Sequence, residues 1–178
     1  MSIEKSNSLT GHERKMRPDQ IIVTKTDLSG KIRYGNRTFF EFSDYSGDEC
    51  IGKQHNLIRH PDMPRTVFDL LWKTIAAGNE IFAYVNNRSK NGDNYWVLAH
   101  VTPSRDSAGS IIGYHSNRRA PNRDALNEHI IPLYQRLLKA EQAASSPKAA
   151  LADGAAIVDS ILRERSMSFN QFMFFLGV

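Results

Sequence analysis

The sequence predicts an α+β domain built on a five-stranded antiparallel sheet, with several short helices and one longer helix on one face. Two observations lead to this prediction. Five β-type runs are separated by turn-forming residues, and the helical segments stand together between the second and third runs instead of alternating with strands. Grouped helices indicate a layer packed on an antiparallel sheet, because parallel strands need a crossover after each strand.

A hairpin is expected at the start of the domain. Residues 21–27 are rich in β-branched side chains and end at the turn Asp27-Leu28-Ser29-Gly30, after which residues 31–36 form a second strand. Turn residues between two such runs are typical of a hairpin. These two strands begin the sheet.

Helical segments follow the hairpin. Residues 37–42 form a short aromatic-rich helix, and Ser46 with Glu49 makes a capping-box pattern before another. The longer helix is expected to start at Pro64 and to end at Gly78. At 100° per residue its apolar side chains form a stripe about 140° wide. Trp72 lies on the edge of this stripe, so we expect it to border the core.

Three more strands complete the predicted sheet, over residues 81–87, 95–103 and 111–117. The pair Asn91-Gly92 is a strong hairpin signal between the first two of them. Alternation along residues 81–87 puts Asn87 at the end of an otherwise apolar face. A buried amide needs hydrogen-bonding partners, so this position asks for a polar neighbour or ligand.

The chain divides into three parts. Residues 1–18 are predicted to be a flexible or capping segment, residues 19–121 the domain, and residues 122–178 a helical C-terminal extension. In the extension Pro132 predicts a kink or a break, and residues 143–153 have a linker-like composition. Two further helices are expected over residues 155–165 and 168–178. The last one has an apolar face formed by Phe169, Phe172, Met173 and Leu176.

Composition excludes several classes of protein. A net charge of +4 without a clustered basic stripe argues against nucleic-acid binding, and Arg118, Arg119 and Arg123 are interpreted as a solvated segment boundary rather than a phosphate site. The single cysteine, Cys50, excludes an intrachain disulfide and a multi-thiolate metal site. Neither a secretory signal nor a run of roughly 20 apolar residues is present. We therefore expect a cytoplasmic protein without a membrane span.

No catalytic motif is found. The sequence has no nucleophile elbow, P-loop, dinucleotide fingerprint or His-x-x-x-His zinc pattern, and His55 and His60 are poorly spaced for a shared helical face. The sequence thus predicts a protein that is not an enzyme and holds no metal ion.

The group Arg59-His60-Pro61-Asp62 is unusually polar for a segment beside a buried helix. Its ionisable side chains must be solvated, mutually paired or bound to a ligand. One interpretation is structural, with Asp62 capping the helix at Pro64 and Arg59 tethering it. The other is a binding site, since a flat heteroaromatic ligand could satisfy Asn87 and stack near Trp72.

Four blocks together resemble the PAS sensor domain of bacterial aerotaxis receptors, which carries FAD. They are residues 56–64, 71–74, 77–78 and 87–97, within a likeness that spans about residues 20 to 120. The resemblance implies the PAS fold, with FAD held non-covalently between helices and sheet. It also implies the site: Arg59, His60 and Asp62 match the flavin-binding motif, Trp72 a position beside the ring, Asn87 an amide at its edge, and Asn36 and Phe68 further pocket positions.

The function implied is that of an FAD-binding sensor of redox state or oxygen in aerotaxis or related signalling. It would act as a free-standing homodimer through a chemotaxis-type partner protein. The extension would provide output or dimerisation, or would fold back on its own sheet. Light-sensing PAS domains need a cysteine close to the ring, and Cys50 does not match that position. Two alternatives stay open: a cofactor-free interaction module, and a haem-binding gas sensor with His60 and His115 as axial ligands.

Overall fold

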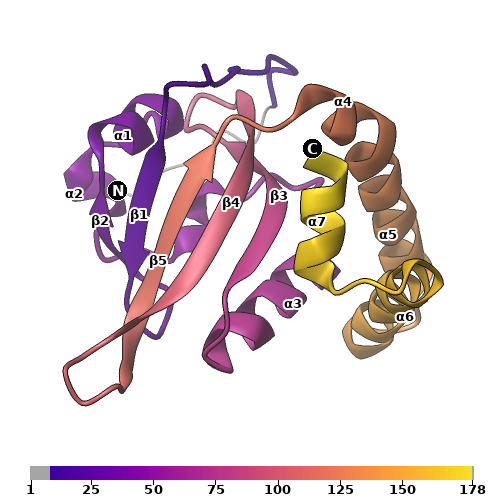
Figure 1. Ribbon diagram of the computed structural model, residues 1–178. Coiled ribbons are helices and arrows are strands. Elements are labelled where there is room, and N and C mark those ends of the chain that lie inside the picture. The colour runs from indigo at the N-terminus through magenta and orange to yellow at the C-terminus, as the bar shows by residue number, and fades with distance from the viewer. Residues whose placement is uncertain (1–8, 178) are drawn as a thin grey trace.

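The computed structural model describes residues 9–177 and confirms the α+β prediction. Its sheet is antiparallel throughout, with the strand order β2-β1-β5-β4-β3 (Figure 1). The first and last strands of the fold therefore lie side by side in the middle of the sheet. The strands are β1 (Ile22–Thr26), β2 (Ile32–Gly35), β3 (Ile81–Arg88), β4 (Asn94–Arg105) and β5 (Ile111–Arg119).

The sheet has one long, regular hairpin, formed by β3 and β4, which pair from Ile81 opposite Val101 to Arg88 opposite Asn94. Alternation along β3 buries Asn87 on the same face as Val85, as expected. The strand β5 extends to Arg119, beyond the predicted end at residue 117, because it keeps pairing with β1 and β4. Arg118 thus lies inside a central strand.

The helices α1 (Arg37–Ser43), α2 (Gly47–Cys50), η1 (His55–Ile58, a 3₁₀ helix) and α3 (Arg65–Ala76) form the layer on the inner face of the sheet. The predicted capping box between Ser46 and Glu49 is present. Inward side chains of both layers form the core. Since strand alternation leaves only every second residue facing inward, this layer contacts a narrow set of sheet residues.

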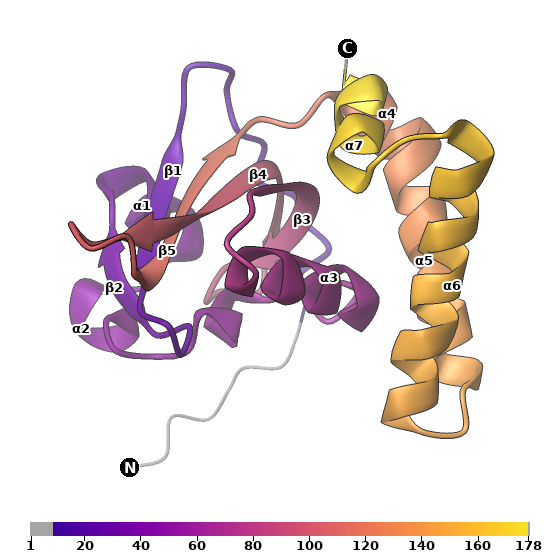
Figure 2. The ribbon, with the colours of Figure 1, turned by 60° about the horizontal axis from the view of Figure 1, so that its bottom comes forward.

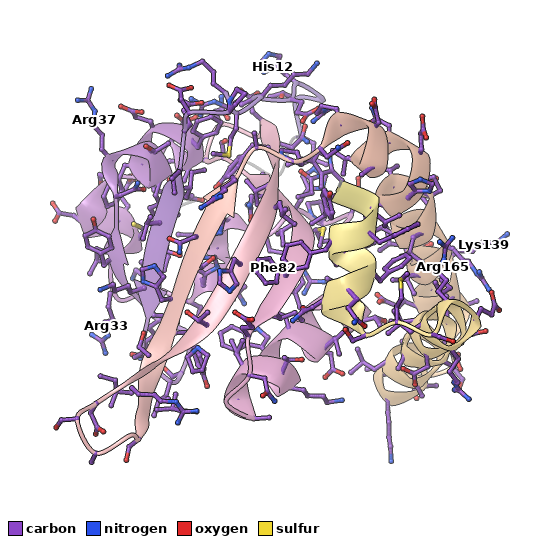
Figure 3. All side chains as sticks on the ribbon, in the orientation of Figure 1. His12, Arg33, Arg37, Phe82, Lys139 and Arg165 are labelled. Atoms are coloured by element: carbon purple, nitrogen blue, oxygen red, sulfur yellow. The ribbon has the colours of Figure 1, made fainter. Side chains whose placement is uncertain are left out.

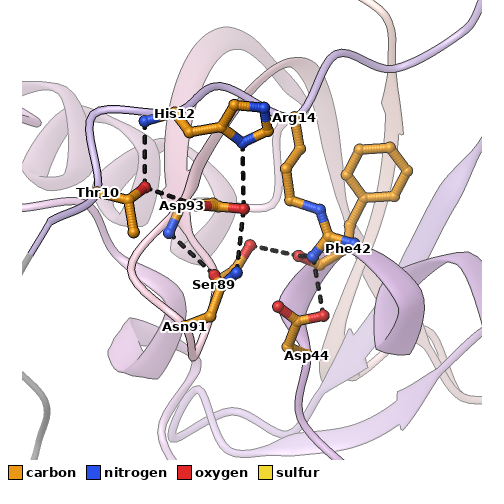
Figure 4. A network of polar contacts seen from close by, with 8 residues as sticks. All are labelled: Thr10, His12, Arg14, Phe42, Asp44, Ser89, Asn91 and Asp93. Carbon is orange, nitrogen blue, oxygen red and sulfur yellow. Dashed lines mark hydrogen bonds and ion pairs between the residues drawn. The ribbon is translucent and has the colours of Figure 1, made fainter.

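The N-terminal segment, residues 9–18, acts as a cap at the start of β4. The backbone of His12 accepts from the Asn94 N–H at 3.0 Å, and the Arg14 N–H donates to the Asn94 carbonyl at 2.8 Å. Arg14 also reaches the carboxylate of Asp44 at 2.9 Å, and His12 pairs with Asp93 (Figure 4). The capping interpretation fits this part of the segment. Residues 1–8 lie outside the described residues.

The C-terminal extension is helical from Arg123 onward. Its elements are α4 (Arg123–Ala125), η2 (Leu126–Ile130, a π turn), α5 (Ile131–Ala143), α6 (Pro147–Arg165) and α7 (Phe169–Gly177). The π turn stands directly before Pro132, which occupies the first turn of α5, so the helix continues without a break. The linker predicted over residues 143–153 is wrong. Ser146 caps α6 and Pro147 opens it, and the alanine-rich sequence that follows favours a helix.

The extension folds back on the domain. Helices α5 and α6 form an antiparallel hairpin near α3, and α7 packs against β3 (Figures 1 and 2). The Tyr134 hydroxyl donates to the Tyr84 carbonyl at 2.7 Å, which ties α5 to β3. The predicted apolar face of the last helix is buried at Phe172, Met173 and Leu176. Within the described chain, the extension therefore covers its own sheet.

Candidate ligand-binding cavity

A cavity of about 370 Å³ lies between the helical layer and the inner face of the sheet. This volume is within the range of small-molecule and cofactor sites. Its wall is apolar over much of its area and polar at a few positions. The sheet contributes Thr24, Thr26, Val85, Asn87, Ala99, Val101, Tyr114, His115, Ser116 and Arg118, the turn after β1 contributes Leu28 and Ser29, and the helical side contributes Gln54, His55, Asn56, Ile58, Arg59, Phe68, Asp69, Leu71, Trp72 and Ile75.

The polar atoms of the cavity wall are short of partners. Among residues 9–177, six buried side-chain nitrogen or oxygen atoms have no hydrogen-bond partner, and four of them belong to cavity residues. Buried polar groups in proteins are nearly always hydrogen-bonded, since an unsatisfied one costs about 1–3 kcal/mol. These atoms are Thr26 Oγ1, Asn87 Nδ2, Ser116 Oγ and Arg118 Nη1. Their concentration indicates a place for a polar ligand.

A buried cation stands at the sheet side of the cavity. Arg118 is 3% exposed, and its Nη2 donates to Thr24 Oγ1 at 2.8 Å and to His55 Nε2 at 2.7 Å. Since a guanidinium can only donate, His55 Nε2 is the acceptor, which assigns the imidazole proton to Nδ1. Burial and the charge of Arg118 lower the pKa of His55 to about 3. His55 is therefore neutral.

On the helical side of the cavity, a second arginine, Arg59, lies against the ring of Phe68. The Arg59 guanidinium lies 4.6 Å from the centre of the Phe68 ring and donates to the Met63 carbonyl at 2.8 Å. Burial lowers the pKa of Arg59. A backbone bridge joins Arg59 to Asn87, so η1 and β3 close the cavity together.

Trp72 forms the rim of the cavity. Its ring packs edge-on against Tyr114, with centroids 5.6 Å apart, and it is 39% exposed. Trp72 was expected to border the core rather than face water; it does border the cavity, but the expectation that it avoids water is wrong, because the residue is exposed at the rim. An aromatic residue at this place can stack on a planar group that enters the cavity.

Three of the predicted site residues, Asn36, His60 and Asp62, do not line this cavity. Asn36 uses its amide to cap α1, accepting from the Phe39 and Val23 N–H groups and donating to the Ile21 carbonyl. His60 is buried outside the cavity wall, with its Nδ1 accepting from the Asp62 N–H at 3.2 Å. The Asp62 side chain is 74% exposed. A local turn directs His60 and Asp62 away from the ligand space.

The structural interpretation of Asp62 is also wrong. The N-terminus of α3 is capped by Glu141 of α5, whose carboxylate accepts from the Arg65 N–H at 3.0 Å and the Thr66 N–H at 2.8 Å. Arg59, Phe68, Trp72 and Asn87 line the cavity.

The sequence analysis missed Arg118 and His55. Arg118 was interpreted as part of a solvated boundary, which is wrong because β5 continues through it. Alternation from Tyr114 through Ser116 would have placed Arg118 on the inner face, had the strand been extended. No local pattern marks His55 as a partner of Arg118, which lies 63 residues further along the chain.

The fold of residues 32–118 belongs to a known family. Residues 32–118 match the family model described as the PAS fold, and the chain contains a PAS domain. Solved structures agree in fold: the light-state LOV domain of the blue-light photoreceptor Aureochrome1 superposes with a TM-score of 0.55 at 23% identity, covering 63% of this chain and 88% of that one. A LOV domain studied with a flavin analogue gives a TM-score of 0.55 at 15% identity, over 65% and 87% of the two chains.

Among curated proteins, the chain is similar to aerotaxis receptors and phototropins. It is 36% identical to the aerotaxis receptor of Escherichia coli (strain K12) over 129 residues, which cover 72% of this chain and 25% of the receptor. Phototropin-2 of Oryza sativa subsp. japonica is 27% identical over 115 residues, 61% of this chain and 13% of phototropin-2. The chain thus spans a quarter or less of the length of these two relatives.

None of the helices within residues 9–177 is long and apolar enough to cross a membrane. In the same part of the chain, no three His, Cys, Asp or Glu side chains are grouped so that they could hold a metal ion.

Proposed function

We propose that this protein is an FAD-binding PAS sensor of redox state or oxygen, which signals through a partner protein and catalyses no reaction of its own. The observation that supports it most is the cavity wall, where apolar surface surrounds four buried polar atoms without partners. A flavin ring is flat, apolar on its faces and polar at one edge, so it complements this wall. The likeness to the aerotaxis receptor supports the same function.

Named residues would hold the cofactor. Asn87 Nδ2 and Ser116 Oγ are free to bond the polar edge of the ring, and Val85, Ala99 and Val101 provide an apolar floor. Trp72 and Phe68 would cover the ring from α3. The flavin supplies reversible electron uptake with a change in charge and hydrogen bonding, and the protein's part is to bind, orient and respond.

The cavity of about 370 Å³ would hold the flavin ring, and the ribityl and adenine parts would then extend past the rim at Trp72. Arg59 stands next to this side of the cavity and also borders the groove between the domain and α5. A guanidinium there can contact a phosphate group.

The alternatives fit this wall less well. A cofactor-free interaction module would gain nothing from leaving Asn87 and Ser116 unpaired in its interior. For a haem sensor, His115 lines the cavity, but His60, the other predicted axial ligand, would have to enter a cavity that it does not line. Light sensing by a cysteine would need a thiol at the ring, and Cys50 is buried in α2 outside the cavity wall.

The wider proposal follows the same likeness. We infer that the protein works in the cytoplasm, forms a homodimer and passes its signal to a chemotaxis-type protein. Its buried free thiol, Cys50, is compatible with a reducing compartment.

The test is the visible absorbance of the purified chain after reconstitution with FAD, with the released cofactor identified by mass. We expect about one flavin per chain. Asn87→Ala should weaken FAD binding about fivefold to thirtyfold, as expected for 1–2 kcal/mol of lost hydrogen bonding. Its effect on the free energy of unfolding without FAD should be small, because Asn87 Nδ2 has no partner to lose.

Asn127→Ala is the matched control, since Asn127 is exposed on η2 and far from the cavity wall. It should leave FAD affinity unchanged. A wild-type chain that folds but takes up no flavin under any redox condition would refute the proposed function. Unchanged affinity in Asn87→Ala would refute the role of Asn87 alone.

A further inference from the structure

Arg118 is a buried cation that lines the cavity, and one nitrogen of its guanidinium has no hydrogen-bond partner. Its Nη2 is occupied by Thr24 Oγ1 and His55 Nε2, whereas its Nη1 is buried and has no partner. The residue lies in the middle of the sheet, opposite Ile22 on β1 and Ala99 on β4. It is held firmly enough to direct the free nitrogen toward a ligand.

The charge of Arg118 is not balanced by the described protein. Its two side-chain partners are neutral, since a hydroxyl carries no charge and His55 is kept unprotonated. Within residues 9–177, no carboxylate pairs with it. Burial lowers the pKa of Arg118 to about 10, which still leaves it cationic at neutral pH. A buried charge without a counter-charge is costly, and proteins keep such groups mainly at binding sites.

A positive charge at this place makes the cavity selective for electron-rich ligands. Ser116 lies two residues before Arg118 on β5, and therefore on the same face, and its hydroxyl has no partner. Thr26 on β1 adds a second hydroxyl without a partner. In the low dielectric of the interior an ion pair with Arg118 would be much stronger than in water. A ligand that gains a negative charge inside the cavity would therefore be bound more tightly after the gain.

We propose that Arg118 is the residue through which the cavity distinguishes the redox states of its ligand, by favouring the reduced, anionic flavin ring over the neutral oxidised ring. This inference rests on the proposed function. Conversion between the two forms takes two electrons and one proton from an external reductant, and the net change on the ring is one negative charge. Arg118 Nη1 would then bond the charged edge of the ring.

The expected consequence is a higher flavin midpoint potential. If Arg118 binds the reduced form tenfold more tightly relative to the oxidised form, the two-electron potential rises by about 30 mV. Because Arg118 belongs to β5 and bonds Thr24 on β1, a change in its contacts would be felt by two central strands. This gives the ligand's charge a direct way to act on the sheet.

The experiment measures the midpoint potential of FAD bound to the full chain, by spectroelectrochemical titration, together with the Kd for oxidised FAD. Arg118→Met should lower the potential by about 30 mV or more, a tenfold or larger loss of preference for the reduced form. The Kd for oxidised FAD separates this loss of preference from a general loss of binding, because an equal weakening of oxidised and reduced FAD would leave the potential unchanged. Arg118→Lys keeps the charge and should stay close to the wild-type potential.

Arg119→Met is the matched control, because Arg119 is the next residue of β5, carries the same charge and is exposed. It should leave the potential unchanged. A wild-type potential in Arg118→Met, or an equal drop in Arg119→Met, would overturn the inference while the flavin site stands. If Arg118→Met does not fold, Arg118→Gln is judged by the same criterion. A wild-type chain that binds no FAD would overturn the proposed function, and this inference with it.

Discussion

At the scale of the residue, His55 shows how the cavity sets protonation. Its Nε2 accepts from Arg118 at 2.7 Å and lies 3.3 Å from Thr24 Oγ1, so a proton on Nε2 would face a cation at hydrogen-bonding distance. Burial adds to this effect, and the pKa of His55 falls from 6.5 to about 3. The folded protein thus requires the neutral imidazole.

This requirement predicts a pH dependence of stability. Because the folded pKa of His55 lies below its unfolded value, its stabilising contribution is complete above pH 6.5 and is lost as the pH falls toward about 3. We expect His55→Gln to remove this part of the dependence. The difference in unfolding free energy between wild type and variant should then change by up to about 1.4 kcal/mol per pH unit in that window.

Urea denaturation at a series of pH values provides the measurement. His129→Gln is the control, since His129 is exposed on η2, and its pH profile should follow that of the wild type. A His55→Gln profile parallel to the wild type between pH 6.5 and 3 would contradict the placement of His55 against Arg118.

At the scale of the element, α3 connects the cavity with the C-terminal hairpin. One end of α3 is capped by Glu141 of α5, and its middle carries Phe68 and Trp72 to the cavity wall. Helix α6 docks against the same end. A Cβ added at Gly154 would come within 1.9 Å of Thr66 Oγ1, so the approach of α6 to α3 depends on a residue without a side chain.

The cap predicts that the hairpin and α3 stabilise each other. Glu141→Ala should lower the free energy of unfolding by about 1–2 kcal/mol, because the Arg65 and Thr66 N–H groups and the helix dipole lose their carboxylate. Amide hydrogen exchange at Arg65 and Thr66 should become faster. Glu128→Ala, at an exposed position of η2, serves as the control and should change stability by less than about 0.5 kcal/mol. Equal stabilities of the two variants would show that the cap contributes nothing.

At the scale of the whole molecule, α7 protects the open edge of the sheet. The strand β3 is the last in the sheet order, and an exposed edge is a template for pairing with another chain. Asn170 covers this edge as a neighbouring strand would, accepting from the Phe82 N–H at 2.9 Å and donating to the Glu80 carbonyl at 3.1 Å. Phe82 lies beside α7 (Figure 3). Its ring stacks on that of His100, with the ring centroids 4.1 Å apart.

Deletion of residues 167–178 should therefore increase self-association, because it uncovers both the edge of β3 and the apolar surface under Phe172 and Met173. Analytical ultracentrifugation over a range of concentrations would measure the change in mass. Phe175→Ala is the control, since Phe175 is 58% exposed and should have a small effect. An unchanged distribution of mass after the deletion would remove α7 from any role in assembly.

Interactions between residues close in sequence explain why much of the fold could be predicted from the sequence. Hairpin turns, the Ser46 capping box and two-residue alternation act over a few neighbours, so the sheet, its helical layer and the inward position of Asn87 could be predicted without coordinates. The resemblance to aerotaxis receptors brought Arg59, Phe68, Trp72 and Asn87 to one site, and all four line the cavity.

Tertiary structure decided what depends on distant partners. Arg118 is buried because β5 is held between β1 and β4, and no local signal marks where that pairing stops. The same holds for α3, whose cap lies 75 residues or more away in Glu141, and for the extension, which folds back because β3 offers an edge to cover. Such contacts arise only when the chain is compact. The sequence shows that the segment from His55 to Asn87 is polar. Only the fold decides which of its polar side chains line the cavity, which lie in a turn and which face solvent.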